Sequence, residues 1–187
     1  MAKPLLAGVV GLVALVSGCG GSEPAAPAAA PTSAAPTPTA AATGPAYTQP
    51  ASLCEAADLR PLTELYPKQP SKPIGDGPSM CMTRLESTAD GLQVRINAIW
   101  MKRVRDGALA YGNLRREEAY RNYTDISGAG GAAGWARTDD GLRLLTYDGN
   151  VVLTIDVTHI DKARPLPTDL PPRLARVAAS VFANLSP

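Results

Sequence analysis

The residues best suited to chemistry in this chain are its three cysteines and its single histidine. Thiols and imidazoles supply many of the nucleophiles and metal ligands that proteins use. Because His159 stands alone, a histidine-rich metal site is excluded, and a zinc site would have to gather ligands from scattered positions. The sequence therefore predicts no metal and no cofactor.

Cys19 ends a segment, residues 1–18, that has the pattern of a signal peptide. Lys3 provides the positive start, and Leu5 to Val16 form an apolar run shorter than the roughly 20 residues needed to cross a bilayer. The run closes on Leu15-Val16-Ser17-Gly18-Cys19, which resembles the lipobox of bacterial lipoproteins. That resemblance implies cleavage before Cys19, acylation of the cysteine and a lipid anchor on the extracytoplasmic face of the cell membrane. The alternative is an ordinary secretory signal cut near Gly20.

Residues 19–50 are predicted to be the lipidated N-terminus followed by a disordered linker. The stretch consists almost entirely of Ala, Pro, Thr, Gly and Ser, with one charge at Glu23. Such a composition has little to bury and so cannot offset the entropy lost on folding. A chain of this length would span roughly 90 Å when extended and about 30 Å as a coil.

Cys54 and Cys81 lie in the predicted folded domain, residues 51–187. In an exported protein the default state of such a pair is a disulfide. The bridge would stabilise the domain by roughly 3–4 kcal/mol through the entropy of the unfolded chain. The alternative is a reactive thiol pair, but neither a Cys-x-x-Cys spacing nor a basic helix start favours it.

The pattern of residues 51–187 predicts an α+β fold. Apolar and polar residues alternate from Leu92 to Trp100 and from Val151 to Val157, which is typical of half-buried strands. A helix starting near Asp106 and a closing helix after Pro171 and Pro172 are also expected. The predicted architecture is an antiparallel sheet of about five strands with the helices packed on one face. Five polar side chains are expected on the opposite face: Arg95, Asn97, Thr154, Asp156 and Thr158.

Several residues could carry chemistry, and each has a plainer interpretation. His159 near Asp156 and Asp161 fits a surface position at a strand end better than a catalytic one. The glycine-rich segment 128–134 lacks the Gly-Lys-Ser/Thr of a phosphate loop, so a tight connection is expected. Asp139, Asp140 and Asp148 lack calcium-loop spacing and fit turns. We therefore predict no catalytic residues.

Basic residues form the one charge feature of interest. Lys102, Arg103 and Arg105 precede a predicted helix that carries the three residues proposed for surface docking: Arg115, Arg116 and Arg121. They could contact anionic lipid or an envelope polymer, although a solvated helix face balanced by acidic neighbours is the simpler interpretation. A net charge of +1 gives no reason to expect a nucleic-acid partner.

The domain resembles a family of exported actinobacterial lipoproteins of unknown function. The matching segments are Ser52-Leu53-Cys54, Met80-Cys81-Met82, 126–135, 144–157 and 175–185. The usual aromatic residue soon after the second cysteine is absent, as is a hydrophobic segment after Tyr66. The resemblance implies an envelope location and a disulfide-pinned α+β domain, and it supplies no catalytic residues.

These observations predict a membrane-anchored envelope lipoprotein whose domain is not an enzyme and binds a ligand or partner. The partner would be an envelope protein, a lipid or a glycan. The alternative is an accessory or sensor subunit of a membrane or cell-wall complex, docked through its basic residues; an enzyme is the least favoured class.

Overall fold

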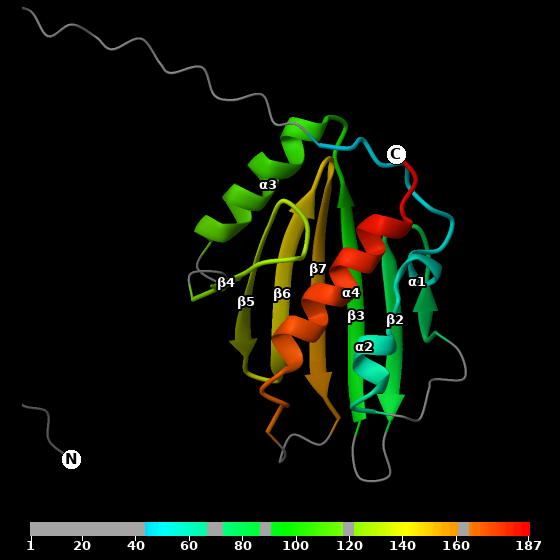
Figure 1. Cartoon of the computed structure of the whole chain (residues 1–187), viewed down its shortest axis with the longest axis vertical. Coiled ribbons are helices and arrows are strands. Elements are labelled where there is room, and N and C mark those ends of the chain that lie inside the picture. Colours follow the sequence, from blue (N-terminus) through cyan, green and yellow to red (C-terminus); the bar gives the residue numbers. More distant parts are fainter. Residues whose placement is uncertain (1–43, 67–72, 87–90, 118–121, 161–164) are drawn as a thin grey trace, which may run out of the picture. The chain divides into compact units, whose positions relative to one another are not determined.

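A seven-stranded sheet in which every neighbouring pair of strands is antiparallel forms the centre of the described chain (Figure 1). The computed structural model describes residues 44–66, 73–86, 91–117, 122–160 and 165–187. The strand order is β1-β2-β3-β7-β6-β5-β4. The strands are β1 (Gly75–Asp76), β2 (Met80–Glu86), β3 (Gly91–Trp100), β4 (Thr124–Ile126), β5 (Ala132–Thr138), β6 (Gly141–Asp148) and β7 (Val151–His159).

The two central strands show why the alternating pattern predicts the sheet. In β3 and β7 the apolar residues alternate with polar ones, so one face of the pair is apolar. Val94 lies opposite Val157 and Ile96 opposite Ile155, and all four side chains are at most 1% exposed. Burial of these facing pairs confirms the strand assignment and its inward face.

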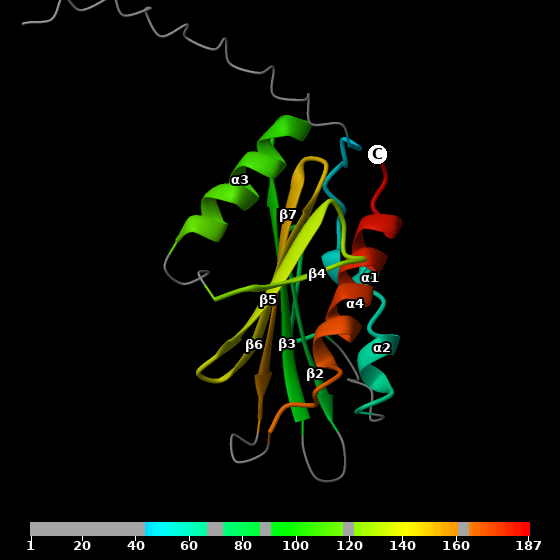
Figure 2. The ribbon, with the colours of Figure 1, turned by 60° about the vertical axis from the view of Figure 1, so that its left-hand side comes forward.

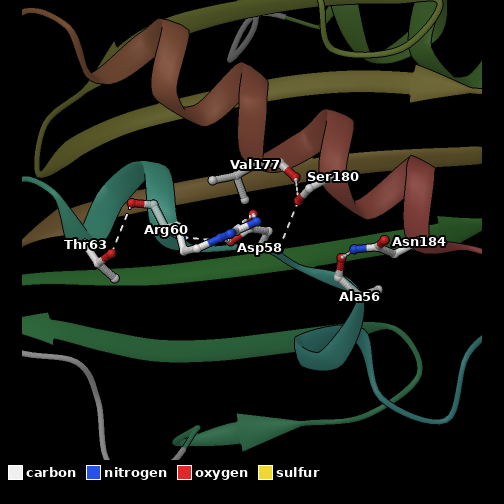
Figure 3. Close-up of polar contacts among 7 residues, drawn as sticks. All are labelled: Ala56, Asp58, Arg60, Thr63, Val177, Ser180 and Asn184. Carbon is white, nitrogen blue, oxygen red and sulfur yellow. Dashed lines mark hydrogen bonds and ion pairs between the residues drawn. The ribbon is translucent and has the colours of Figure 1, made fainter.

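Three helices cover this apolar face: α1 (Leu53–Ala56), α2 (Arg60–Thr63) and α4 (Leu170–Asn184). The apolar stripe of α4, which includes Leu174, Val177 and Val181, is fully buried, as its spacing predicts. Polar contacts join α4 to the segment around α1 (Figure 3). The Asp58 backbone N–H donates to Ser180 Oγ at 2.9 Å, and Asn184 Nδ2 donates to the Ala56 carbonyl at 3.0 Å.

The predicted disulfide is present and attaches α1 to the sheet. Cys54 of α1 is bonded to Cys81 of β2, with their Cα atoms 4.9 Å apart. The Ser52 hydroxyl caps α1 by accepting the backbone N–H of Glu55 at 3.0 Å. The bridge therefore holds a helix of only four residues that could not persist in isolation.

Two details of the predicted fold are wrong. The described sheet has seven strands instead of about five, because the short strands β1 and β4 add to its edges. The helices are also not all on one face. The helix α3 (Val104–Arg116) packs on the face opposite α4, against β6 and β7 (Figure 2). It covers a second apolar cluster centred on Tyr123, Leu145 and Val152.

Residues 44–50, which the sequence analysis places in the linker, pack on the domain; we call them the strap. The Tyr47 backbone N–H donates to Asn150 Oδ1 at 2.7 Å, and Asn150 Nδ2 donates to the Tyr47 carbonyl at 3.1 Å. The Tyr47 ring stacks on Phe182 with centroids 6.0 Å apart. Gly149 accepts this close contact because a Cβ there would lie 1.8 Å from the Pro45 carbonyl oxygen. The strap thus ties the domain's N-terminal end to the β6–β7 turn.

Candidate binding surfaces

The α3 side of the sheet has an uncovered part that we call the open face. Its side chains come from β2, β3, β6 and β7, alternate with core residues and are exposed or half-buried. The strand registers bring together the five polar residues that the alternation places on the face opposite the core. The open face carries eight polar side chains, Arg84, Gln93, Arg95, Asn97, Arg143, Thr154, Asp156 and Thr158, and three apolar ones, Met80, Met82 and Ile99.

A row of three charges crosses the middle of the open face. Asp156 on β7 lies opposite Arg95 on β3 and, on its other side, opposite Arg143 on β6. Arg143 Nε donates to Asp156 Oδ1, and the two side chains are only 32% and 23% exposed. Arg95 is exposed at the end of the row. Because one carboxylate lies between two guanidinium groups, the row keeps a net positive charge.

The open face is suited to polar groups, and its three arginines, Arg84, Arg95 and Arg143, outnumber its acidic residues. Guanidinium groups bind carboxylates and phosphates through paired hydrogen bonds, whereas amides and hydroxyls serve both donors and acceptors. A groove of about 240 Å³ runs over the charged row, lined by Gln93, Arg95, Thr138, Asp140, Leu142, Arg143, Asp156, Val157 and Thr158. Within this groove two arginines face two aspartates, Asp140 and Asp156, so the formal charges there balance. Small-molecule pockets are roughly 300–1,000 Å³ and mostly apolar. The groove therefore suits one polar group of a larger partner better than a whole small molecule.

His159 lies at the margin of this region and is buried, with only 5% of its surface exposed. The expectation of a surface histidine is therefore wrong. It shares a hollow of about 160 Å³ with Asp139 and Asp140. Asp156, three residues before it on the same strand, projects to the opposite face of the sheet and pairs with Arg143. The Asp156–His159 pairing that hydrolytic catalysis could use is thus not formed, and Asp161 lies outside the described residues.

Arg115, one of the predicted docking residues, is largely an internal contact between α3 and the β4–β5 edge. Its side chain is 22% exposed, and its guanidinium carbon lies 5.9 Å from the Tyr111 ring centroid and 5.3 Å from that of Tyr123. Nη2 pairs with Asp125 at 3.1 Å. Gly134 makes room for the guanidinium, because a Cβ there would lie 1.9 Å from Nη1.

The other two predicted docking residues lie elsewhere. Arg116 is exposed and donates to the Asn113 side chain, whereas Arg121 lies outside the described residues. An open groove of about 460 Å³ beside Arg115 is lined by Tyr111, Gly112, Arg115, Asp125, Ile126, Ala132 and Ala133. Burial raises the pKa of Tyr111. Arg115 and Arg116 therefore do not present one common docking surface.

The remaining candidates act as turns. Gly128 and Gly130 take φ angles of 81° and 89°, so residues 128–131 form a tight connection, whereas residues 132–134 already belong to β5. Asp148 accepts a hydrogen bond from the Tyr47 hydroxyl at 2.7 Å.

Among the described residues no group of three His, Cys, Asp or Glu side chains is placed to hold a metal ion. No helix in this part of the chain is long and apolar enough to span a membrane. Cys19 is not among the described residues.

Two signals in the sequence could have revealed the strap and were missed. Tyr47 and Gln49 are the only large side chains between Ala25 and Ala51 in a segment otherwise made of small residues and proline. Gln49 Nε2 donates to Ser79 Oγ at 2.9 Å, so both residues bind the domain.

Comparisons of the chain with protein-family models, with curated proteins and with solved structures find no match. The resemblance to actinobacterial lipoproteins accordingly stays a prediction.

Proposed function

We propose that this chain is an exported lipoprotein, anchored to the extracytoplasmic face of a cell membrane through acylated Cys19, and that its domain is a non-enzymatic binding module. The observation that carries the binding role is the charged row of Arg95, Asp156 and Arg143 on the open face. Its partner is a polar, anionic component of the cell envelope, and a glycan bearing carboxylates or phosphates fits this chemistry best.

The open face is favoured because it carries polar side chains that the fold does not require. A sheet of this kind needs one buried face, and the apolar residues under α4 supply it. The other face holds two arginines and one aspartate at neighbouring register positions, and the Arg143–Asp156 pair is partly desolvated. Such pairs stabilise folds little, so recognition is the better explanation of the row.

A charge reversal with a matched control tests the binding role. Arg95→Glu turns the net charge of the row negative without touching the core, and it should weaken binding of the full chain to cell walls isolated from the producing bacterium by about tenfold. Arg176→Glu is the control, because Arg176 is an exposed arginine on α4, across the sheet. Equal binding by the two variants would show that the open face is not the binding surface.

The anchor is tested separately at Cys19. Cys19→Ala should leave the chain unprocessed or release it from the membrane, because no acyl chains can be attached. Mass spectrometry of the natural protein should find an acylated N-terminal cysteine. A Cys19→Ala chain that is still cleaved and still fully membrane-bound would contradict the anchor.

The alternative role, an accessory or sensor subunit of a membrane or cell-wall complex, is favoured by the exposure of Arg116 at the end of α3. Arg116→Glu should then disturb co-purification of the complex while thermal unfolding stays unchanged. Arg115 is unsuitable for this test because its reversal would also break the contact with Tyr111 and Tyr123. An enzymatic role through His159 would be excluded by an unchanged phenotype of His159→Ala.

A further inference from the structure

The strap brings the chain into the domain at one particular corner. A Cβ on Gly44 would lie 3.1 Å from the Gly149 Cα atom and 3.4 Å from Val104 Cγ1, so the strap begins between the β6–β7 turn and the first turn of α3. Figure 1 shows the cyan strap at the end of the sheet where α3 starts. Residues 19–43 therefore join the domain at this corner.

The same corner is basic and carries an exposed apolar side chain. Lys102, Arg103 and Arg105 are all exposed, and Asp106 Oδ1 lies 3.8 Å from Arg105 Nε. One turn further along α3, Leu109 is 61% exposed. We call Lys102, Arg103, Arg105 and Leu109 the basic corner.

The fold does not account for these residues. Arg103 is the N-cap of α3 and makes no side-chain capping bond, although Ser, Thr, Asp or Asn would stabilise that position. Cations in the first turn of a helix are unfavourable because the helix dipole is positive there. Packing of α3 uses other residues, including Ala110, Tyr111 and Leu114. The charges and the exposed leucine therefore serve a contact outside the domain.

We propose that the basic corner docks on the surface of an anionic lipid bilayer, the same bilayer that holds the Cys19 anchor; this inference rests on the proposed anchor. Phosphates of the lipid headgroups pair with Lys102, Arg103 and Arg105, and Leu109 enters the interface between headgroups and acyl chains. Basic residues around one apolar side chain, placed where a lipidated segment joins the domain, have the charge and position for this partner.

Because the linker tethers the domain to the bilayer, even a weak contact of the basic corner with lipid is sufficient for docking. Each basic residue near an anionic leaflet increases binding by about fivefold. If residues 19–43 form the flexible coil that their composition predicts, their length of about 25–30 Å would keep the domain at a high local concentration beside the bilayer, and docking would be an intramolecular step. The docked domain holds its binding groove away from the lipid, because Gln93 lies seven residues from Trp100 along β3, or roughly 23 Å of strand.

An environment-sensitive fluorophore at position 109 tests the proposal in the full lipidated chain, reconstituted in vesicles. The Leu109→Cys chain is labelled with NBD, since Cys54 and Cys81 are paired and an acylated Cys19 does not react. The control is Thr168→Cys, an exposed position just before α4 on the other side of the sheet. Vesicles of phosphatidylcholine alone are compared with vesicles containing phosphatidylglycerol.

Docking predicts that NBD at position 109 becomes brighter and blue-shifted only in the anionic vesicles, that 1 M salt reverses the change, and that position 168 does not respond. Replacing Lys102, Arg103 and Arg105 by Gln should shift the docking equilibrium on the order of 100-fold and abolish the signal. If the chain floats with anionic vesicles but the NBD fluorescence at position 109 behaves like that at position 168, docking is refuted while the anchor stands. A chain that does not float with vesicles at all would refute the anchor and docking with it.

Discussion

The two faces of the sheet are built differently. Under α4 the apolar contact is continuous from β2 to β5 and is closed further by α1, α2 and the disulfide. On the other side α3 covers a small cluster around Leu145 and Val152 and leaves the open face in solvent. From this comparison we expect the α4 face to contribute most of the stability, which would leave the side chains of the open face available for binding. Experiments that weaken each side in turn test this division.

Loss of the disulfide should have the largest effect, because it acts on the α4 face. Replacing both Cys54 and Cys81 by Ser opens a loop with a sequence separation of 27 residues. The chain-entropy model then gives a loss of about 3–4 kcal/mol in the free energy of unfolding. Urea unfolding of the oxidised natural chain and of the double variant measures it. A loss below about 1 kcal/mol would show that α4 holds this face without the bridge.

Two neighbouring residues of β7 compare the faces directly. Leu153 is fully buried under α4, and Thr154 lies on the open face. Leu153→Ala should lower the free energy of unfolding by about 3 kcal/mol, because it leaves a cavity in the core. Thr154→Ala should change it by less than about 0.5 kcal/mol. Similar losses in urea titrations of the two variants would mean that the open face also contributes to stability.

The attachment of α3 combines its apolar contact with a close backbone approach to the β6–β7 turn. A Cβ on Gly107 would lie 2.2 Å from the Gly149 carbonyl oxygen, whereas a Cβ on Gly112 meets nothing within 4 Å. Gly107→Ala should therefore cost about 2 kcal/mol by pushing the helix off the β6–β7 turn. Gly112→Ala should stabilise the same helix by up to about 1 kcal/mol. A lower melting temperature for Gly107→Ala together with a higher one for Gly112→Ala would confirm the contact. Changes of the same sign in both variants would refute it.

The sequence predicted the buried α4 face of the sheet better than the face on which α3 packs. The long strands were predictable because Leu92 to Trp100 and Val151 to Val157 carry a period of two that only a half-buried strand explains. The side on which α3 packs was not predictable, since both faces of β6 are apolar, with Leu144 in one cluster and Leu145 in the other.

The candidate sites were predictable only in part. Alternation placed Arg95 and Asp156 on one face. The tight turn at Gly149-Asn150 sets the register of β6 on β7 and brings Arg143 opposite Asp156, but the prediction did not follow that register, so Arg143 was missed. The docking prediction treated Arg115 as a surface residue, because the gap at Gly134 that admits its guanidinium exists only in the folded sheet. Composition likewise hid the strap, in which a single tyrosine makes the decisive contacts.

The strap also gives the smallest predicted effect, which depends on pH. The pKa of Tyr47 is raised well above its usual value of about 10 by burial and, secondarily, by its hydrogen bond to Asp148 and the charge of that carboxylate. The unfolded chain loses this phenolic proton near pH 10, whereas the folded chain keeps it. Stability from the neutral phenol is therefore fully present below pH 10 and falls as pH rises beyond it.

Tyr47→Phe should thus cost about 1 kcal/mol at pH 7, through the lost hydrogen bond, and progressively less above pH 10. Urea unfolding of both chains from pH 7 to pH 11 measures the difference. Asp148→Asn is the control, because it keeps an acceptor for the hydroxyl and leaves burial, the main cause of the raised pKa, in place, so its stability should fall above pH 10 as that of the natural chain does. If the cost of Tyr47→Phe stays constant across this range, the hydroxyl of Tyr47 does not hold the strap to the β6–β7 turn through its proton.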